Sequence, residues 1–209
     1  MTHVAAVIER NKLDYPLIAV GAKHGNPCGV AIADNTEEAL QKMLEGDPLA
    51  IFGGLVMTNF PITGFEAEIL RRHLMSDNAK RLLDGVIAPF FTEEAKVELN
   101  RKYGKCRLLE NSALGLLNQA SLDQSPRFRK VRGGFIKQPN YCFVLDFADA
   151  EMEIVGPELS ATQKIDLLLA WAIGSTSNSN TITPVKQACW PCSLLKLRHS
   201  SPCCTAWLR

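Results

Sequence analysis

Two adjacent ionisable residues, Lys23 and His24, are the groups in this sequence best suited to acid–base chemistry. They end an apolar run over residues 17–22 and precede the turn-forming sequence Gly25-Asn26-Pro27. A lysine ammonium stabilises a developing oxyanion, and a neutral imidazole accepts a proton near neutral pH. Because open α/β sheets place their chemistry at strand ends, we expect the two side chains to converge on one bound group. Taken alone, the pair favours a simpler interpretation, a solvated lysine beside a hydrogen-bonded loop histidine.

Three further features carry polar or planar groups at strand boundaries. Asp84, which Gly85 follows, is suited to orient an amide or an amine. Asn180 ends a polar run, and its side-chain amide can donate a hydrogen bond to a carbonyl without a change of charge. Phe52 and Gly53 offer an apolar wall and backbone N–H groups that a planar ligand approaches. The spacing of these residues does not by itself select a reaction.

Short apolar runs alternate with amphipathic runs along the chain, which predicts an α/β fold with one main sheet and helices around it. The run over 17–22 is apolar throughout, which favours a buried, parallel strand. Residues 111–138 are expected to be irregular until a strand near Gly133-Gly134, and the cations before it to form a solvated face. Predicted strands cover residues 17–22, 29–33, 49–58, 82–88, 106–109 and 181–183, and predicted helices cover 2–12, 36–45, 64–74, a stretch from 92, and 160–174.

The 209 residues are 46% hydrophobic and 22% charged, with a formal net charge of +1, as in an ordinary globular domain. Lysine and arginine are spread along the chain, so we expect no nucleic-acid partner and no anionic membrane surface. The longest apolar run, Leu167 to Ile173, is far too short to span a bilayer, and the first residues lack the apolar region of a signal peptide. These features predict a cytoplasmic protein.

Seven cysteines divide into two groups. Cys28, Cys106 and Cys142 are isolated, as buried thiols of a reducing compartment would be. Four more crowd the last residues, and we considered a zinc site there, formed by Cys189 and Cys192 together with Cys203, Cys204 or His199. The adjacent pair lacks the spacing that lets two thiolates reach one ion, so no metal is expected. We predict instead an atypical tail over residues 184–209, frameshifted or disordered, that contains Cys189, Cys192, Cys203 and Cys204.

Four segments over about residues 1–183 resemble, in order and spacing, the transformylase domain of the AICAR formyltransferase/IMP cyclohydrolase family. They are Lys23-His24-Gly25-Asn26-Pro27-Cys28-Gly29-Val30, Asp47-Pro48 with Phe52-Gly53-Gly54, Asp84-Gly85-Val86-Ile87-Ala88-Pro89 with Glu93-Glu94-Ala95, and Trp171 to Asn180. The resemblance implies a cytidine deaminase-like α/β fold, a mixed sheet with flanking helices that forms the first half of the transformylase domain. It also implies metal-free transfer of a formyl group from 10-formyltetrahydrofolate to the 5-amino group of AICAR in purine biosynthesis, by a homodimer.

The same resemblance assigns roles to individual residues. His24 matches the histidine that assists deprotonation of the attacking amine, and Lys23 matches the lysine that stabilises the oxyanion of the tetrahedral intermediate. Asn180 matches the asparagine that helps to hold the reacting groups. The matching substrate-binding positions are Asn26, Phe52, Gly53 and Asp84, of which Asp84 corresponds to the contact with the nucleotide base.

The sequence also departs from the family pattern. Ala50-Ile51 stands where the family commonly has serine, and the cyclohydrolase domain and the Arg-Tyr-Gly segment that grips the phosphate are not in this sequence. From Lys186 onward it does not continue into the family's Gly-Gln-x-Ser-Arg loop. We therefore expect a truncated transformylase with weak or no turnover. The alternative is a non-catalytic folded remnant that serves as a structural or interaction module, with its cut surface buried in an oligomer.

Overall fold

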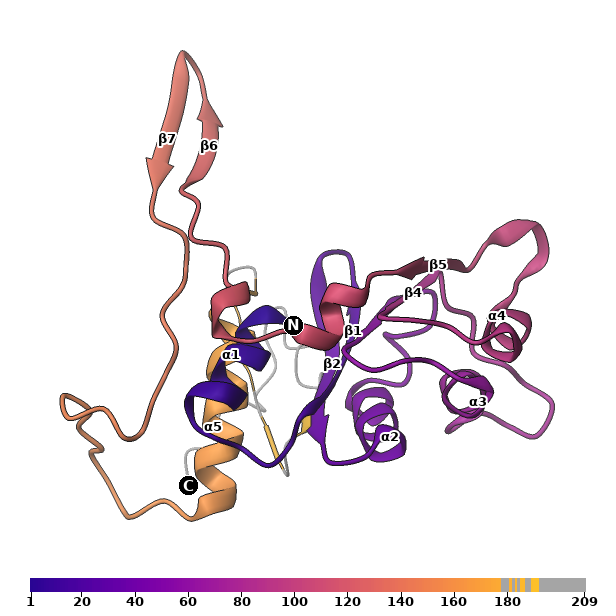
Figure 1. Ribbon diagram of the computed structural model, residues 1–209, viewed down its shortest axis with the longest axis horizontal. Coiled ribbons are helices and arrows are strands. Elements are labelled where there is room, and N and C mark those ends of the chain that lie inside the picture. Colours follow the sequence, from indigo (N-terminus) through magenta and orange to yellow (C-terminus); the bar gives the residue numbers. More distant parts are fainter. Residues whose placement is uncertain (178–180, 182, 184, 187–188, 192–209) are drawn as a thin grey trace, which may run out of the picture.

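The computed structural model describes residues 1–177, 181, 183, 185–186 and 189–191 (Figure 1). A six-stranded sheet in the order β5-β4-β3-β1-β2-β8 forms the body, and β6 pairs with β7 in a separate hairpin. The expected α/β fold, a mixed sheet with flanking helices, is confirmed. The strands are β1 (Leu17–Lys23), β2 (Asn26–Ala33), β3 (Leu55–Thr58), β4 (Gly85–Ala88), β5 (Arg107–Glu110), β6 (Arg127–Val131), β7 (Gly134–Gln138) and β8 (Cys189–Pro191).

Five α-helices in the described part cover the sheet. In Figure 1, α2 lies on one side of β1 and β2, with α3 and α4 following along the sheet, while α1 and α5 lie together on the other side. None of the helices described is long and apolar enough to cross a membrane. They are α1 (Thr2–Arg10), α2 (Thr36–Gly46), α3 (Gly64–Arg72), α4 (Glu93–Leu99) and α5 (Ala161–Gly174), and the short 3₁₀ helices are η1 (Lys102–Gly104), η2 (Ser112–Leu116) and η3 (Gln119–Ser121).

The strand predicted as parallel is antiparallel to both of its neighbours. β1 runs antiparallel to β2 and to β3, and the parallel part of the sheet is β3-β4-β5. The prediction was wrong because an apolar run reports burial on both faces, not strand direction. β1 is central, between two strands and between two helical layers, and Ile18 and Ala19 are fully buried.

The apolar stretch 49–58 is a strand only over its last four residues. Asp47 folds the preceding part into turns, because its Oδ1 accepts from the backbone N–H groups of Leu49 at 3.1 Å and Ala50 at 2.8 Å. The turn buries the Ile51 side chain against β1, and a Cβ on Gly21 would lie 2.7 Å from Ile51 Cδ1. The predicted strand is therefore shortened, and residues 47–54 become a turn packed over the sheet.

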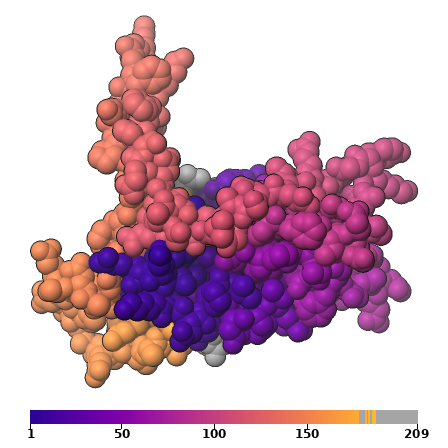
Figure 2. Space-filling view, viewed as in Figure 1, coloured from indigo at the N-terminus to yellow at the C-terminus, as the bar shows by residue number. Residues whose placement is uncertain are grey.

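Residues 127–131, predicted to precede the strand as a loop, form β6 of an exposed hairpin with β7. Gly133, with φ +83°, supplies the left-handed conformation that its turn requires. Figure 2 shows this hairpin as a lobe standing away from the body. The positive residues are solvated as expected, but Arg127, Arg129 and Lys130 lie on a regular strand and Arg132 lies in the turn that follows it.

The three isolated cysteines differ in burial. Cys28 and Cys106 are buried as expected, and burial raises the pKa of the Cys106 thiol. Cys142 is half-exposed, and its Sγ donates to Asp123 O at 3.1 Å. The expectation of burial was therefore wrong for Cys142, because the connection after β7 runs over the surface.

Candidate active site

One edge of the sheet collects most of the predicted site residues. β1 ends at Lys23, β3 begins just after Gly53-Gly54, and β4 begins just after Asp84. Two backbone hydrogen bonds join the segments, from Gly53 N to Leu82 O at 2.7 Å and from Asp84 N to Gly54 O at 2.9 Å. Since β1 is antiparallel to β3, this edge holds the carboxyl end of β1 and the amino ends of the parallel strands. Of the predicted site residues at this edge, only those at the end of β1 lie at the carboxyl end of a strand, whereas Gly53 and Asp84 precede the amino ends of β3 and β4.

Lys23 reaches across this edge to the turn before β3. Its Nζ donates to Phe52 O at 2.7 Å, and a Cβ placed on Gly53 would lie 4.0 Å from Nζ. Gly53 has φ +69°, a backbone conformation that few other residues adopt without strain. The fold therefore brings Lys23, Phe52 and Gly53 together. An ammonium has three N–H donors, and Phe52 O uses one of them.

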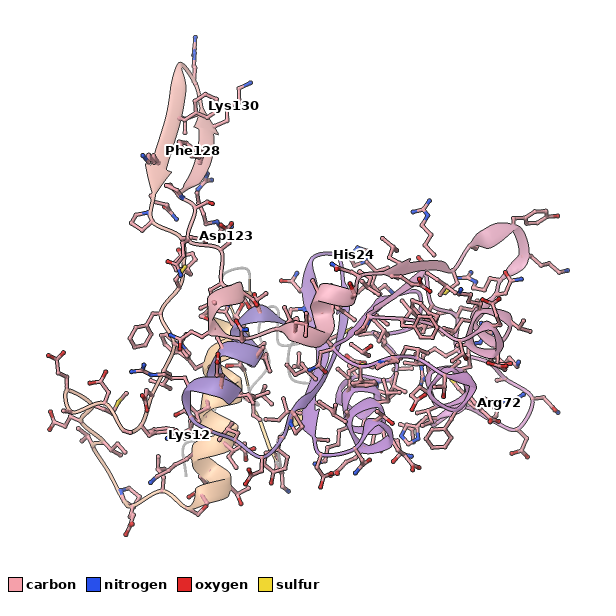
Figure 3. All side chains as sticks on the ribbon, viewed as in Figure 1. Lys12, His24, Arg72, Asp123, Phe128 and Lys130 are labelled. Atoms are coloured by element: carbon pink, nitrogen blue, oxygen red, sulfur yellow. The ribbon has the colours of Figure 1, made fainter. Side chains whose placement is uncertain are left out.

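His24 occupies the tip of the β1–β2 hairpin (Figure 3). His24 and Gly25 have φ values of +53° and +74°, as in the two-residue turns that match strand twist. A positive φ costs a non-glycine residue about 1 kcal/mol or more, and such strain is found at functional sites more often than elsewhere. The imidazole is exposed and makes no hydrogen bond to a described residue. The convergence of Lys23 and His24 on one bound group therefore stays a prediction.

Asn26 begins β2, directly opposite Lys23 in the register of the hairpin. Its side-chain Nδ2 lies 3.4 Å from His24 O, a long hydrogen bond across the turn. Asn26 is half-buried and next to both candidate catalytic residues. The hairpin thus places Asn26 within the same corner.

Asp84 is held by an arginine that the sequence reasoning missed. Arg101 Nη1 donates to Asp84 Oδ1 at 2.8 Å and to Leu83 O at 2.7 Å, which places the guanidinium at the start of β4. The Asp84 side chain is 61% exposed, so one face of the carboxylate stays open to a ligand. Arg101 follows α4 in a basic stretch with no distinguishing spacing, so no signal in the sequence singles it out.

Several predictions fall on residues outside the described part. Asn180 lies there, as do Ile182 and the cysteines at 192, 203 and 204. The predicted strand over 181–183 was wrong for its two described residues, Thr181 and Thr183, which have no regular secondary structure. Within the residues that are described, no group of three or more His, Cys, Asp and Glu side chains is placed to hold a metal ion. The geometry of the candidate site therefore rests on Lys23, His24, Phe52 and Asp84.

Among the described residues, the side chains of His24, Phe52 and Asp84 leave this edge open rather than enclosed. A shallow depression of about 300 Å³ lies along α3, and Figure 3 shows Arg72, one of its lining residues, well away from His24. It contains none of the predicted site residues. Its lining consists of Phe65, Glu68, Ile69, Arg72 and His73.

Comparison with known proteins agrees with the motifs at this edge. Residues 3–193 match the family described as AICARFT/IMPCHase bienzyme, and the match runs beyond residue 183, where the atypical tail was predicted to begin. The chain is 36% identical over 178 residues to the bifunctional purine biosynthesis protein PurH of Listeria welshimeri, and 34% identical over 169 residues to that of a Thermoanaerobacter species.

These relatives are considerably longer than the chain. The alignments cover 85% and 80% of this chain but only 32% and 30% of the two relatives, so the chain spans about a third of their length. A third relative, PurH of Caldicellulosiruptor bescii, is 34% identical over 170 residues, which is 80% of this chain and 29% of that protein. With its motifs in register and the family match extending over most of its length, the chain belongs to the AICARFT/IMPCHase bienzyme family.

Proposed function

We propose that this chain carries the acid–base and oxyanion corner of a formyl-transfer site. The donor is 10-formyltetrahydrofolate and the acceptor is the 5-amino group of AICAR, in the biosynthesis of purines. One observation carries the proposal most strongly. In a chain of this family, a lysine ammonium is fixed beside the Phe52-Gly53 turn, next to a histidine on a strained hairpin tip.

The residues suit the reaction because the acceptor is a poor nucleophile. The amine of AICAR is conjugated with a carboxamide, so it needs a base to remove its proton as the new bond forms. His24 takes that proton while the amine nitrogen attacks the formyl carbon. The carbonyl oxygen becomes an oxyanion, to which Lys23 donates one of the N–H groups that Phe52 O leaves free. Collapse of the intermediate breaks the bond to N10 of the folate, which leaves with a proton as tetrahydrofolate.

The other residues of the edge suit binding. The half-exposed Phe52 ring and the backbone at Gly53 present a surface for a planar heterocycle. The Asp84 carboxylate, oriented by Arg101, offers an acceptor for an amide or amine of the nucleotide. Asn26 lies beside His24, and Asn180 completes the proposed set. Lys23 and Arg107, at the start of β5, give the edge cationic groups that suit a nucleotide phosphate or a folate carboxylate.

We extend the proposal to the setting of the reaction. The mixed sheet belongs to a cytidine deaminase-like domain, the protein acts in the cytoplasm, and it works as a homodimer. A homodimer suits the open edge, because a second copy would supply the wall that the described residues do not form around Lys23 and His24.

A second function is consistent with the open edge around Lys23 and His24. A non-catalytic remnant that acts as a structural or interaction module would keep the fold and the motifs but bind neither ligand. Thermal melting of the purified chain separates the two functions, since a ligand that binds the folded state raises Tm. We expect AICAR and a folate analogue each to raise Tm. No shift with either ligand would favour the interaction module.

Substitution of the histidine tests its role. In a full-length version that carries the whole transformylase, His24→Ala is expected to lower formyl transfer by about 10²–10⁴-fold, the usual contribution of a general base. The matched control is His73→Ala, which removes a histidine that pairs with Glu45 and is not one of the predicted site residues, and it is expected to leave turnover unchanged. Equal rates for the two variants would remove His24 from the catalytic role.

A further inference from the structure

The β6–β7 hairpin is a positively charged arm whose residues are all exposed. We define the basic arm as residues 127–138, which contain five cations and no acid. Every residue of the arm is exposed, including Phe128, Phe135 and Ile136. None of its cations forms an ion pair with a described residue. The cations are Arg127, Arg129, Lys130, Arg132 and Lys137.

Both faces of the arm mix apolar and positive side chains. In the observed register Phe128 lies opposite Lys137, and Lys130 lies opposite Phe135, so these four share one face. The Lys137 ammonium is 6.0 Å from the centre of the Phe128 ring, which is at the outer limit of a cation–π contact. A two-stranded hairpin is at best marginally stable alone in water, so this arm needs a partner that covers an apolar, cationic surface.

A segment with the opposite character follows the arm in the sequence. We define the acidic segment as residues 149–158, Asp-Ala-Glu-Met-Glu-Ile-Val-Gly-Pro-Glu, with four acids and no cation. Its first six residues alternate acid with apolar residue, the period of a strand with one charged and one apolar face. Within the described part of the chain this segment pairs with no strand, and its acids form no ion pair. Val155 is 89% exposed.

The arm and the acidic segment of one chain are held apart. Figures 1 and 2 show the arm leaving the body on one side, whereas residues 149–158 lie beyond α5 on the other. The base of the arm is clamped by Asn140 Nδ2, which donates to Asp123 O at 2.8 Å. The intervening chain is tied to α1, because Asn11 Nδ2 donates to Leu145 O at 2.8 Å and Arg10 pairs with Asp146 at 2.7 Å. Contact within one chain would require these anchors to break.

We propose that the basic arm of one copy docks on the acidic segment of a second copy, and that the second arm does the same in return. The acidic segment adds as a strand to the free edge of the arm, with its acids facing the lysines and arginines and its apolar side chains covering the phenylalanines. Such a reciprocal exchange is a closed two-fold interface. It rests on the homodimer proposed above and identifies the surfaces that form it.

Charge reversal tests the pairing directly. In the arm variant, Arg129→Glu and Lys130→Glu are combined; in the segment variant, Glu151→Lys and Glu153→Lys are combined. All four side chains are exposed, so both variants are expected to fold. Sedimentation equilibrium at about 50 mM NaCl should show a dimer for the unaltered chain and at least about tenfold weaker association for each variant. A control with Lys102→Glu and Lys105→Glu, equal in charge change but remote from the arm, should dimerise like the unaltered chain.

Mixing the two variants provides the decisive result. Each variant repels itself, but in the mixture a negative arm meets a positive segment and a positive arm meets a negative segment. Equimolar mixing should therefore restore a dimer close in affinity to that of the unaltered chain. Failure of the mixture to associate, or variants that dimerise as tightly as the unaltered chain, would overturn the proposal. The proposal would also be overturned if the unaltered chain is monomeric and its arm binds a labelled single-stranded oligonucleotide, because the arm would then be a nucleic-acid-binding surface.

The same samples distinguish this proposal from the formyl-transfer proposal. AICAR is added to the unaltered chain, and Tm is measured beside the oligomeric state. A dimer that shows no Tm shift with AICAR would refute formyl transfer and leave the arm exchange standing. A monomer that AICAR stabilises would refute the arm exchange and leave formyl transfer standing.

Discussion

Replacing Gly29 by alanine tests how closely helix and sheet approach each other behind the Lys23–His24 corner. Gly29 lies in β2, two residues after Pro27, and α2 crosses directly over it. A Cβ at this position would lie 2.0 Å from the backbone oxygen of Met43. Ordinary contact begins at 3.4 Å, so α2 or β2 has to move by about 1.4 Å. The obstacle is backbone within a helix, which no change of rotamer relieves.

The size of the effect follows from what moves with α2. Leu40, Met43 and Leu44 on this helix are fully buried in the core, so a shift of the helix disturbs all three. Overpacking a close-packed core costs about 1–3 kcal/mol and sometimes more, and a backbone clash belongs at the upper end. Alanine recovers about 0.4–1 kcal/mol by restricting the unfolded chain. We therefore expect a net loss of about 2–3 kcal/mol, a large fraction of the 5–15 kcal/mol typical of a folded domain.

Urea unfolding followed by far-ultraviolet circular dichroism measures this loss. With a slope of about 2 kcal/mol per molar urea, the midpoint should fall by about 1 M or more. The matched control is Gly134→Ala, a strand glycine whose added Cβ meets nothing within 4 Å, and its midpoint should be close to that of the unaltered chain. If the two variants unfold at the same urea concentration, the close approach of α2 to β2 is not as described.

Three further predictions concern polar groups. Arg81 is fully buried and donates to Leu70 O and His73 O at the end of α3. Arg81→Met should therefore lower the free energy of unfolding by about 2 kcal/mol in the same urea assay. An unchanged midpoint would contradict this capping role. Burial alone would raise the pKa of Glu66, but hydrogen bonds from Thr63 and Thr36 outweigh it and hold the pKa below 4.5. The ionised form of Glu66 is thus favoured in the folded state, and its contribution to the free energy of unfolding is present above pH 4.5 and lost as the pH falls through the lowered pKa. Glu66→Gln should therefore flatten the loss of stability in that acid range. An identical pH profile of the variant would show that Glu66 does not contribute. Arg101→Met should change the free energy of unfolding by less than about 1 kcal/mol, because the Asp84–Arg101 pair is partly exposed. The same variant should bind AICAR severalfold more weakly, as measured by calorimetry. Unchanged affinity would remove the Asp84–Arg101 pair from the nucleotide site.

The helices were predictable because their beginnings are set by local chemistry. Asn35, Thr92 and Ser160 each accept a hydrogen bond from a backbone N–H in the first turn of the following helix, and Ser160 forms a capping box with Gln163. These interactions join residues three positions apart, so they are visible in the sequence. The α/β class follows in the same way, from the alternation of apolar and amphipathic runs.

The candidate site was predictable as a set of residues but not as an arrangement. The resemblance of four motifs to one family singled out Lys23, His24, Phe52 and Asp84. Their geometry depends on pairs that are distant in the chain, since Lys23 bonds to Phe52 and Asp84 bonds to Arg101. A single sequence reports the type of each residue and the period of its neighbours, and it contains no record of such pairings.

What the sequence determined by itself is therefore local: where helices begin, which runs are buried, and which motifs resemble a known family. Only the tertiary structure decided that β1 is antiparallel, that the site edge holds the amino ends of β3 and β4, and that the cations after residue 126 lie on a free arm. The physical reason is the same in each case. Burial and capping act over a few residues, whereas strand pairing and ion pairing join residues that only the folded chain brings within reach.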